Sequence, residues 1–236
     1  MDVVRGRRDT PAADRELTAE LLARAATEDV AAVRVWTPHR QLAFGRRDAT
    51  RDRYSRACAL AREHGYQPIE RRVGGRAVAY TGTTLAFAVA VPTADARGGI
   101  DERYEAARTV VREALVDRGA ALGDGEPAAS FCPGAHSIRV TGGGKVAGIA
   151  QRVRRDAALV AGCLVVTDDD ADAIGAVLDP VYRTLDVAFD PASVGSVATA
   201  GGPRDVGAVA RAVESAFVGG PWGDGRRNVR RVGSTI

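Results

Sequence analysis

A glycine-rich turn leads into a predicted β-strand at residues 142–151, which read Gly-Gly-Gly-Lys-Val-Ala-Gly-Ile-Ala-Gln. The strand is expected to begin at Lys145, directly after the turn. Gly148 has no side chain, so it would leave space beside the stem of Lys145 for a bound ligand. The segment therefore predicts a strand that brings one cation into a ligand site.

Lys145 is the only lysine among the 33 basic residues of the chain, and all the others are arginines. A lysine ammonium is a compact charge on a flexible stem, whereas an arginine guanidinium is a rigid planar fork. Retention of one ammonium group indicates a role that arginine cannot fill. Chance survival of a rare residue is the alternative.

A second glycine-rich segment, residues 71–80, reads Arg-Arg-Val-Gly-Gly-Arg-Ala-Val-Ala-Tyr. Two glycines between strands let the backbone approach a ligand and expose N–H groups to an anion. The flanking arginines would hold a phosphate or carboxylate through paired hydrogen bonds. The segment is neither a P-loop nor a dinucleotide fingerprint, because no Gly-Lys-Ser/Thr follows and no helix is expected after it. A plain hairpin turn with solvated arginines is the alternative.

A cysteine in a predicted turn stands close upstream of the lysine strand, within Ser-Phe-Cys-Pro-Gly-Ala-His-Ser at residues 130–137. A thiolate becomes a nucleophile when a nearby cation stabilises it. Lys145 or His136 would supply that cation to Cys132. A buried Cys132 that only packs is the alternative.

These segments together resemble the lipoate–protein ligase A and octanoyltransferase family. Residues 71–80 resemble the family's Arg-Arg-x-x-Gly-Gly-[Gly/Arg]-Ala-Val segment, and residues 145–151 resemble its Lys-[Ile/Val]-x-Gly-x-Ala-Gln segment. Residues 42–46 resemble the short strand ending in glycine that comes earlier in the family. The order and spacing are family-like, so the resemblance covers roughly residues 10–218.

Two pairs of residues depart from the family pattern. Tyr80-Thr81 stands where the family usually has His-Asp, and Ala161-Gly162 stands where many members have His-Gly. These departures leave the preferred acyl chain and acceptor open.

The resemblance implies an α+β fold of the biotin/lipoate-ligase catalytic-domain type, with a mixed, largely antiparallel β-sheet flanked by helices. It also implies protein lipoylation, in which a lipoyl or octanoyl group is attached to a lysine of lipoyl-domain proteins. Such acceptors are the E2 subunits of 2-oxoacid dehydrogenases and the glycine cleavage H protein. Lys145 would stabilise charge that develops during transfer. The implied catalytic residues are Lys145 and Cys132, and the implied substrate-binding residues are Arg71, Arg72, Gly74, Gly75, Arg76, Ala77, Val78, Gly148 and Ala150.

Two reactions fit this family. A ligase would activate free lipoate or octanoate with Mg-ATP to an acyl-adenylate, and it would use a small accessory domain or a separate accessory subunit. A transferase would take octanoate from acyl carrier protein through a Cys132 thioester, although Ser130 falls nearer the family's nucleophile position. The ligase description is placed first because it is the family's general one. A non-catalytic acyl-binding or accessory subunit is a third possibility, and no metal site or tightly bound cofactor is expected.

Composition narrows the class of protein. The 236 residues are expected to form one catalytic domain at 1–218 and a flexible basic tail at 219–236. The 33 basic and 30 acidic residues are intermixed, which disfavours a nucleic-acid binder. The longest apolar stretch, residues 84–91, is far shorter than the roughly 20 residues of a membrane span. An N-terminus without an apolar signal core and three unpaired cysteines lead us to expect a cytoplasmic protein.

Hydrophobic periodicity predicts helices and strands in an α+β order. Residues 120–127 are expected to form a loop, and residues 179–202 mostly a connecting segment. The predicted helices are 14–29, 49–64, 100–118, 169–178 and 205–218, and the predicted strands are 31–36, 41–44, 66–71, 77–80, 84–91, 136–140, 145–151 and 157–166.

Overall fold

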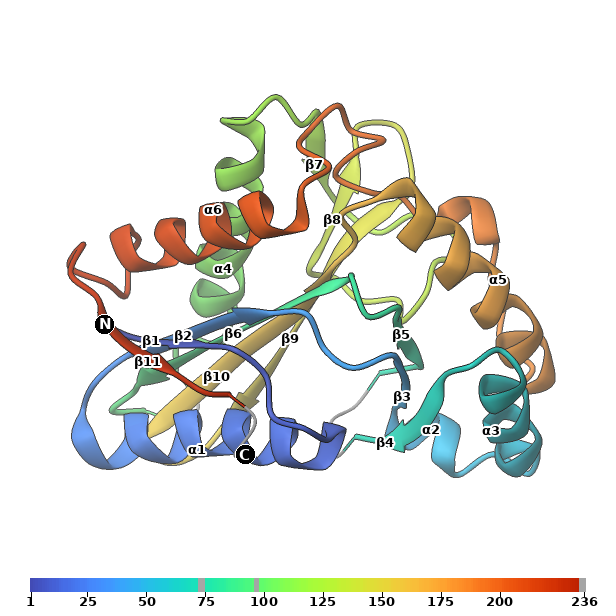
Figure 1. The fold of residues 1–236 in the computed structure, drawn as a ribbon, viewed down its shortest axis with the longest axis horizontal. Helices are drawn as coiled ribbons and strands as arrows, with labels where there is room; N and C mark the ends of the chain where they lie inside the picture. The colour runs from blue at the N-terminus through green and yellow to red at the C-terminus, as the bar shows by residue number, and fades with distance from the viewer. Residues whose placement is uncertain (72–74, 96–97, 234–236) are drawn as a thin grey trace.

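Two β-sheets form the centre of the computed structural model, which describes residues 1–71, 75–95 and 98–233 (Figure 1). The large sheet has the strand order β11-β1-β2-β6-β10-β9-β8-β7, and the small sheet has the order β4-β3-β5. Strand β1 runs parallel to β2 and β11, β3 runs parallel to β4, and all other neighbours are antiparallel. The expected mixed, largely antiparallel α+β fold is therefore confirmed. The strands are β1 (Asp2–Arg5), β2 (Ala32–Trp36), β3 (Gln41–Phe44), β4 (Gln67–Glu70), β5 (Val78–Tyr80), β6 (Leu85–Pro92), β7 (Leu122–Asp124), β8 (Ser137–Val140), β9 (Lys145–Val153), β10 (Ala157–Leu164) and β11 (Asn228–Arg231).

Helices cover both faces of the large sheet and the outer side of the small one (Figure 1). Helices α4 and α6 lie on one face of the large sheet, and α1 lies on the opposite face. Helices α3 and α5 pack against each other beside the small sheet. The helices are α1 (Pro11–Glu28), α2 (Arg46–Ala49), α3 (Tyr54–Glu63), α4 (Ile100–Val116), α5 (Asp168–Thr184) and α6 (Val206–Gly219), with a 3-10 turn, η1 (Pro191–Ser193).

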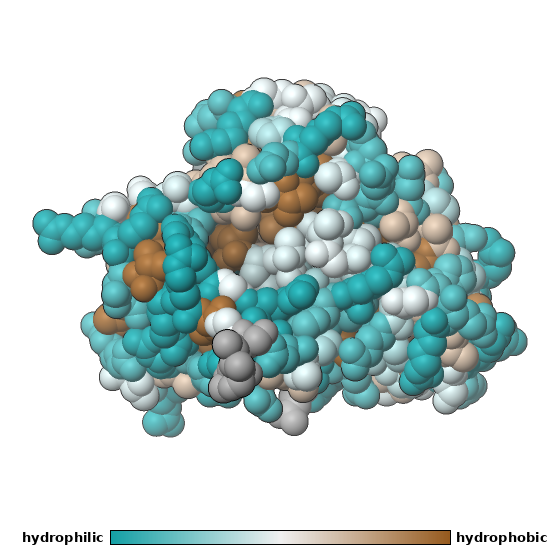
Figure 2. Space-filling view, in the orientation of Figure 1, coloured by the Kyte–Doolittle hydropathy of each residue, from teal (hydrophilic) through white to brown (hydrophobic). Residues whose placement is uncertain are grey.

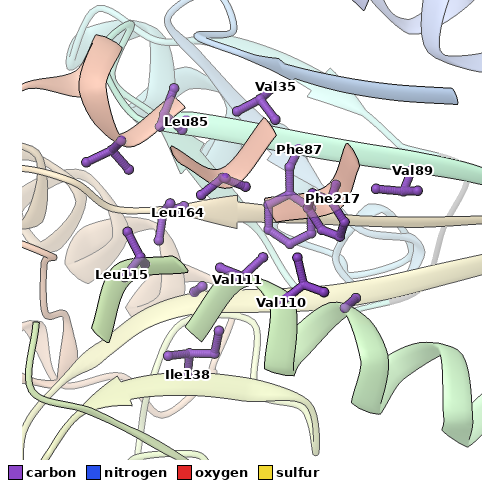
Figure 3. Close-up of a cluster of buried hydrophobic side chains, with 14 of the residues drawn as sticks. Val35, Leu85, Phe87, Val89, Val110, Val111, Leu115, Ile138, Leu164 and Phe217 are labelled. Carbon is purple, nitrogen blue, oxygen red and sulfur yellow. The ribbon is translucent and has the colours of Figure 1, made fainter. Parts of the chain in front are cut away.

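The main hydrophobic core lies between the large sheet and helices α4 and α6 (Figure 3). Phe87 of β6 meets Phe217 of α6 with ring centroids 5.7 Å apart, and Val111 of α4 packs into the same cluster. Removal of this apolar surface from water is the dominant force that holds the layers together. The core thus holds the large sheet in place from one side, and the opposite face of the sheet carries helix α1.

Helix α1 shows how local sequence and packing agree. The Thr10 hydroxyl accepts a hydrogen bond from the backbone N–H of Ala13, and a proline occupies the first helical position. An apolar stripe formed by Leu17, Leu21, Leu22 and Ala25 then packs on strands β1, β2, β6 and β10 in a separate hydrophobic cluster. The helix is held along the sheet by this stripe.

Several predicted boundaries were wrong because tertiary packing outweighed local signals. The single helix expected at 49–64 is two helices, α2 and α3, and the loop expected at 120–127 contains strand β7. The helix expected to end at Leu178 continues to Thr184, straight through Pro180. Its last turns bury Val181 and Tyr182, and this burial offsets the backbone hydrogen bond that a proline removes.

The chain's C-terminal segment differs from the solvated tail that we expected. Residues 228–231 are solvent-exposed, but they form strand β11, which pairs in parallel with β1. The pairing partners are the backbone N–H and C=O groups at the edge of β1. We did not predict strand β1 from the sequence. In the part of the chain with assigned structure, no helix has the length and apolar character to cross a membrane. Figure 2 shows one face covered mainly by hydrophilic residues, with hydrophobic ones gathered near its middle.

A buried ion pair between α1 and β2 generates a stability prediction. The Arg34 side chain is fully buried and donates to Asp14 at 2.6 Å. The variant Arg34→Met is expected to lose about 3–5 kcal/mol of unfolding free energy, because Asp14 would keep a buried charge without its partner. Denaturant unfolding measures the loss. Arg56→Met, which removes an exposed pair with Glu63 in α3, should cost less than about 1 kcal/mol, and equal losses would contradict the assignment.

Candidate active site

A cavity of about 900 Å³ lies over the middle of strands β9 and β10. Helix α1 bounds it on one side, the small sheet bounds it on another, and the segment that carries Cys132 closes it further. A concave site of this size is typical for a small-molecule group. Six of the residues expected at the site line it, namely Arg71, Val78, Cys132, Lys145, Gly148 and Ala150.

Lys145 is the first residue of β9, and its side chain is 1% exposed. Its ammonium donates to both carboxylate oxygens of Glu126, at 3.1 and 3.0 Å, and to the backbone carbonyls of Phe131 and Cys132, each at 3.0 Å. An ammonium has three N–H groups, so these four oxygens take up its donor capacity. In this arrangement Lys145 holds the backbone of the cysteine segment.

Glu126 provides the opposite charge that a buried ammonium needs. Its carboxylate also accepts hydrogen bonds from the hydroxyl groups of Ser130 and Ser137. Ser130, which falls nearest the family's nucleophile position, is buried and directed to Glu126, away from the cavity wall. Nothing in the sequence pattern distinguishes Glu126, since it lies in a segment expected to be a loop.

Cys132 lies in a strained part of the backbone, with a φ of 42°. A residue other than glycine pays a steric cost in this left-handed region, so its surroundings must hold it there. Its N–H donates to the Tyr182 hydroxyl at 2.8 Å, and its carbonyl accepts from Lys145 at 3.0 Å. Its sulfur accepts from the Arg71 guanidinium at 3.1 Å and from the Arg76 N–H at 3.4 Å. Cys132 is thus fixed through its N–H, its carbonyl and its sulfur.

Arg71 is the cation beside the sulfur, whereas the sequence had pointed to Lys145 or His136. Burial works against its charge, but the neighbouring Cys132 sulfur and Tyr80 phenol outweigh that effect, and the pKa of Arg71 rises above its ordinary value. Arg71 also donates to the carbonyl of Arg76 at 2.5 Å. His136 instead stacks on Tyr104, with ring centroids 3.8 Å apart.

The other predicted binding residues take varied positions. Gly75 has a φ of 91°, and a side-chain carbon there would lie 2.8 Å from the Cys132 sulfur, so the turn needs glycine at this position. The Arg76 guanidinium faces away from the cavity and pairs with buried Asp48 at 3.0 Å. The Ala77 carbonyl accepts from Tyr182 at 2.7 Å. Arg72 and Gly74 lie outside the described residues.

The sequence predicted that Gly148 would leave space for a ligand beside Lys145, but in the structure the lysine side chain itself occupies the space next to Gly148. A side-chain carbon at Gly148 would lie 3.0 Å from the Lys145 Cε atom. The two departures from the family pattern meet on the cavity wall, where Tyr80, Ala161 and Gly162 are found. Among the residues with described positions, no three His, Cys, Asp or Glu side chains gather as a metal site would require.

Comparisons with known proteins show the family of this chain. The profile of the lipoyl protein ligase A/B catalytic domain matches residues 10–218. An octanoyl-[GcvH]:protein N-octanoyltransferase of Exiguobacterium sibiricum is 36% identical over 134 residues, which cover 56% of this chain and 47% of that protein. A lipoyl-[GcvH]:protein N-lipoyltransferase of Listeria monocytogenes is 28% identical over 120 residues, 51% of this chain and 43% of that protein. The chain therefore spans about half the length of the curated relatives it matches.

The fold is shared with solved structures at low sequence identity. A crystal structure of lipoate-protein ligase A bound with ATP aligns with a TM-score of 0.75 at 19% identity. The alignment covers 97% of this chain and 88% of that one. Both chains therefore have the same arrangement of sheets and helices.

The Lys145–Glu126 pair predicts a coupling that unfolding can measure. Lys145→Met would leave the Glu126 carboxylate, 21% exposed, without its counter-charge, so we expect a loss of about 3 kcal/mol in unfolding free energy. The double variant Glu126→Gln/Lys145→Met should regain part of it, with a coupling of about 1–3 kcal/mol in a double-mutant cycle. Strictly additive single effects would show that the pair is not a unit.

The three cysteines are expected to differ in reactivity. Burial raises the pKa of the Cys163 thiol above its ordinary value, and Cys58 is buried in α3. Since only the thiolate reacts, iodoacetamide at about pH 8 should label Cys132 first in the folded protein. Peptide mass mapping identifies the labelled residue. Labelling of Cys163 as fast as that of Cys132 in the folded protein would contradict this order of reactivity.

Proposed function

Because the chain belongs to the lipoyl protein ligase A/B catalytic-domain family, we propose that it transfers an octanoyl or lipoyl group to a lysine of a lipoyl-domain protein through a thioester on Cys132. The observation that carries the proposal is the position of the Cys132 sulfur. It lies on the cavity wall and accepts hydrogen bonds from Arg71 and from the Arg76 N–H. Both donors stabilise negative charge on sulfur, and this makes the thiolate available as a nucleophile.

The reaction proceeds in two acyl transfers. In the first, the Cys132 thiol gives up its proton and the resulting thiolate attacks the carbonyl of the acyl donor. The bond from that carbonyl to the donor's nitrogen or sulfur breaks, and the departing nitrogen or sulfur takes up that proton. In the second, the neutral amine of the acceptor lysine attacks the Cys132 thioester. An amide forms, the carbon–sulfur bond breaks, and a proton from the amine returns to Cys132. Donor and product are both acyl compounds, so no net oxidation or reduction occurs.

The acyl donor that we propose is an acylated carrier protein. The relatives from Exiguobacterium sibiricum and Listeria monocytogenes are named for transfer from GcvH. An octanoyl or lipoyl amide on the glycine cleavage H protein is therefore the first donor to test, with an E2 lipoyl domain as acceptor. Octanoyl-acyl carrier protein, whose acyl group is a thioester, would enter the same first step.

The ligase alternative needs ATP with Mg²⁺ and cations that are available to the adenylate phosphate. The cavity volume of about 900 Å³ has space for such a ligand. Arg71, however, is engaged by the Cys132 sulfur and the Arg76 carbonyl, and Lys145 is engaged by Glu126 and two backbone carbonyls. Arg15 and Arg152 also line the cavity, so its cations do not decide between the two routes, and the thioester proposal rests on the position of the Cys132 sulfur.

The test is a transfer assay with Cys132→Ala and a matched control. The full chain is incubated with octanoyl-H protein and an unmodified E2 lipoyl domain, and intact mass spectrometry follows both proteins. We expect an octanoyl adduct that maps to Cys132, and loss of at least about 10³-fold of the transfer rate in Cys132→Ala, as for removal of a covalent nucleophile. Cys58→Ala changes a cysteine outside the cavity wall and should keep the wild-type rate.

Parallel incubations separate the alternatives. Transfer from octanoyl-acyl carrier protein but not from octanoyl-H protein would support Cys132 as the nucleophile and identify the acyl carrier protein as the donor. Transfer from free octanoate that requires Mg-ATP and survives Cys132→Ala would establish the ligase and refute the thioester. Binding of octanoate without acyl transfer from any donor would refute the enzyme proposal and support a non-catalytic acyl-binding subunit.

A further inference from the structure

A tyrosine behind the cavity wall makes direct contact with the cysteine backbone. Tyr182 is fully buried in the last turns of α5. Its hydroxyl donates to the Ala77 carbonyl at 2.7 Å and accepts from the Cys132 N–H at 2.8 Å. The ring packs edge-on against Phe189, with centroids 5.2 Å apart. Tyr182 is not part of the cavity wall, so it touches the nucleophile and not the substrate.

The two hydrogen bonds of Tyr182 join the two halves of the site. Ala77 ends the segment that places Gly75 and the Arg76 N–H against the sulfur, and Cys132 carries that sulfur. One hydroxyl therefore sets the separation between the nucleophile and the N–H group that faces it. No other hydrogen bond to the Cys132 N–H is found among the described residues.

The backbone of Cys132 makes this contact consequential. A φ of 42° is unfavourable for cysteine, and rotation of the peptide to an ordinary φ would carry the sulfur away from Arg71 and Arg76. Without the Tyr182 hydroxyl, the Cys132 N–H would lose its hydrogen-bond partner, and such a rotation would be the simplest relaxation. Burial keeps the pKa of Tyr182 well above its ordinary value, so its hydroxyl stays protonated and can always donate to Ala77.

We propose, on the premise that Cys132 is the nucleophile of the proposed function, that Tyr182 is its positioning residue. The hydroxyl holds Cys132 in the left-handed conformation and so keeps the sulfur between Arg71 and the Arg76 N–H. It acts through the backbone of Cys132 and transfers no proton to the substrate.

The variant Tyr182→Phe tests this role because it removes the hydroxyl and keeps the ring against Phe189. Iodoacetamide alkylation of Cys132 is measured against pH, together with the kcat and KM of acyl transfer. We expect alkylation to slow by about tenfold and its profile to move to higher pH, since the thiolate loses its donors. We expect kcat to fall by a similar factor with little change in KM.

The matched control is Tyr66→Phe. Tyr66 is also buried, and its hydroxyl reaches the Ala173 carbonyl of the same helix α5 at 3.5 Å, but it does not contact the site. This variant should lose less stability than Tyr182→Phe, because it removes one long hydrogen bond and not two short ones, and it should keep the wild-type alkylation profile. A folded Tyr182→Phe protein whose alkylation profile superimposes on wild type would overturn the proposal.

Two further readouts keep the outcome decisive. If Tyr182→Phe does not fold, hydrogen exchange on the wild-type chain compares the Cys132 amide with that of exposed Gly134. Slower exchange at the Cys132 amide supports the proposal that the Tyr182 hydroxyl holds this N–H, and equally fast exchange overturns it. Alkylation needs no acyl donor, so slowed alkylation in Tyr182→Phe alongside a wild-type chain that transfers nothing would refute the proposed function and leave the Tyr182 assignment standing.

Discussion

A buried ammonium must be surrounded by acceptors, and Lys145 meets this requirement in a way that organises the site. Glu126 supplies the counter-charge, and the carbonyls of Phe131 and Cys132 accept the other hydrogen bonds of the ammonium. Strand β9 is thereby tied to the segment that carries the cysteine. The glycine before Lys145 has its own reason, because a side-chain carbon at Gly144 would lie 2.6 Å from the backbone of Gly195. The Lys145 carbonyl accepts from the Gly195 N–H at 2.9 Å, so this close approach anchors the lysine's backbone as well.

The cavity exists because two hydrophobic clusters occupy the same face of the large sheet without merging. Strand β10 contributes Ala157 and Leu159 to the cluster under α1, and Cys163 to the cluster under the small sheet and α5. Between them stands Ala161, next to Ala150 of β9, and these two small side chains leave the sheet surface open. The two hydrophobic clusters thus leave a ligand site between them on the large sheet. The close-packed core on the opposite face holds this sheet in place.

Much of this site was visible in the sequence, and the reason lies in residue chemistry. A single lysine after three glycines, a second glycine pair among arginines and a cysteine upstream all predicted a ligand site, and Arg71, Cys132, Lys145 and Gly148 do line one cavity. Glu126 and Tyr182 were missed. Glu126 stands in an irregular segment with no pattern around it, and Tyr182 follows Asp179-Pro180, a pair that normally ends a helix. Their roles depend on partners that are distant in the chain.

The sequence by itself determined the α+β class, the strand that begins at Lys145 and the residue types of the site, because periodicity and glycine placement are local properties. Only the tertiary structure decided which cation faces the sulfur. Arg71 takes that position because Glu126, 19 residues before Lys145, draws the lysine ammonium to the backbone carbonyls instead. The tertiary structure also decided that α5 runs through Pro180 and that residues 228–231 pair with β1. These outcomes arise from burial and backbone pairing between distant segments, and such free energies are not encoded in any short stretch of the chain.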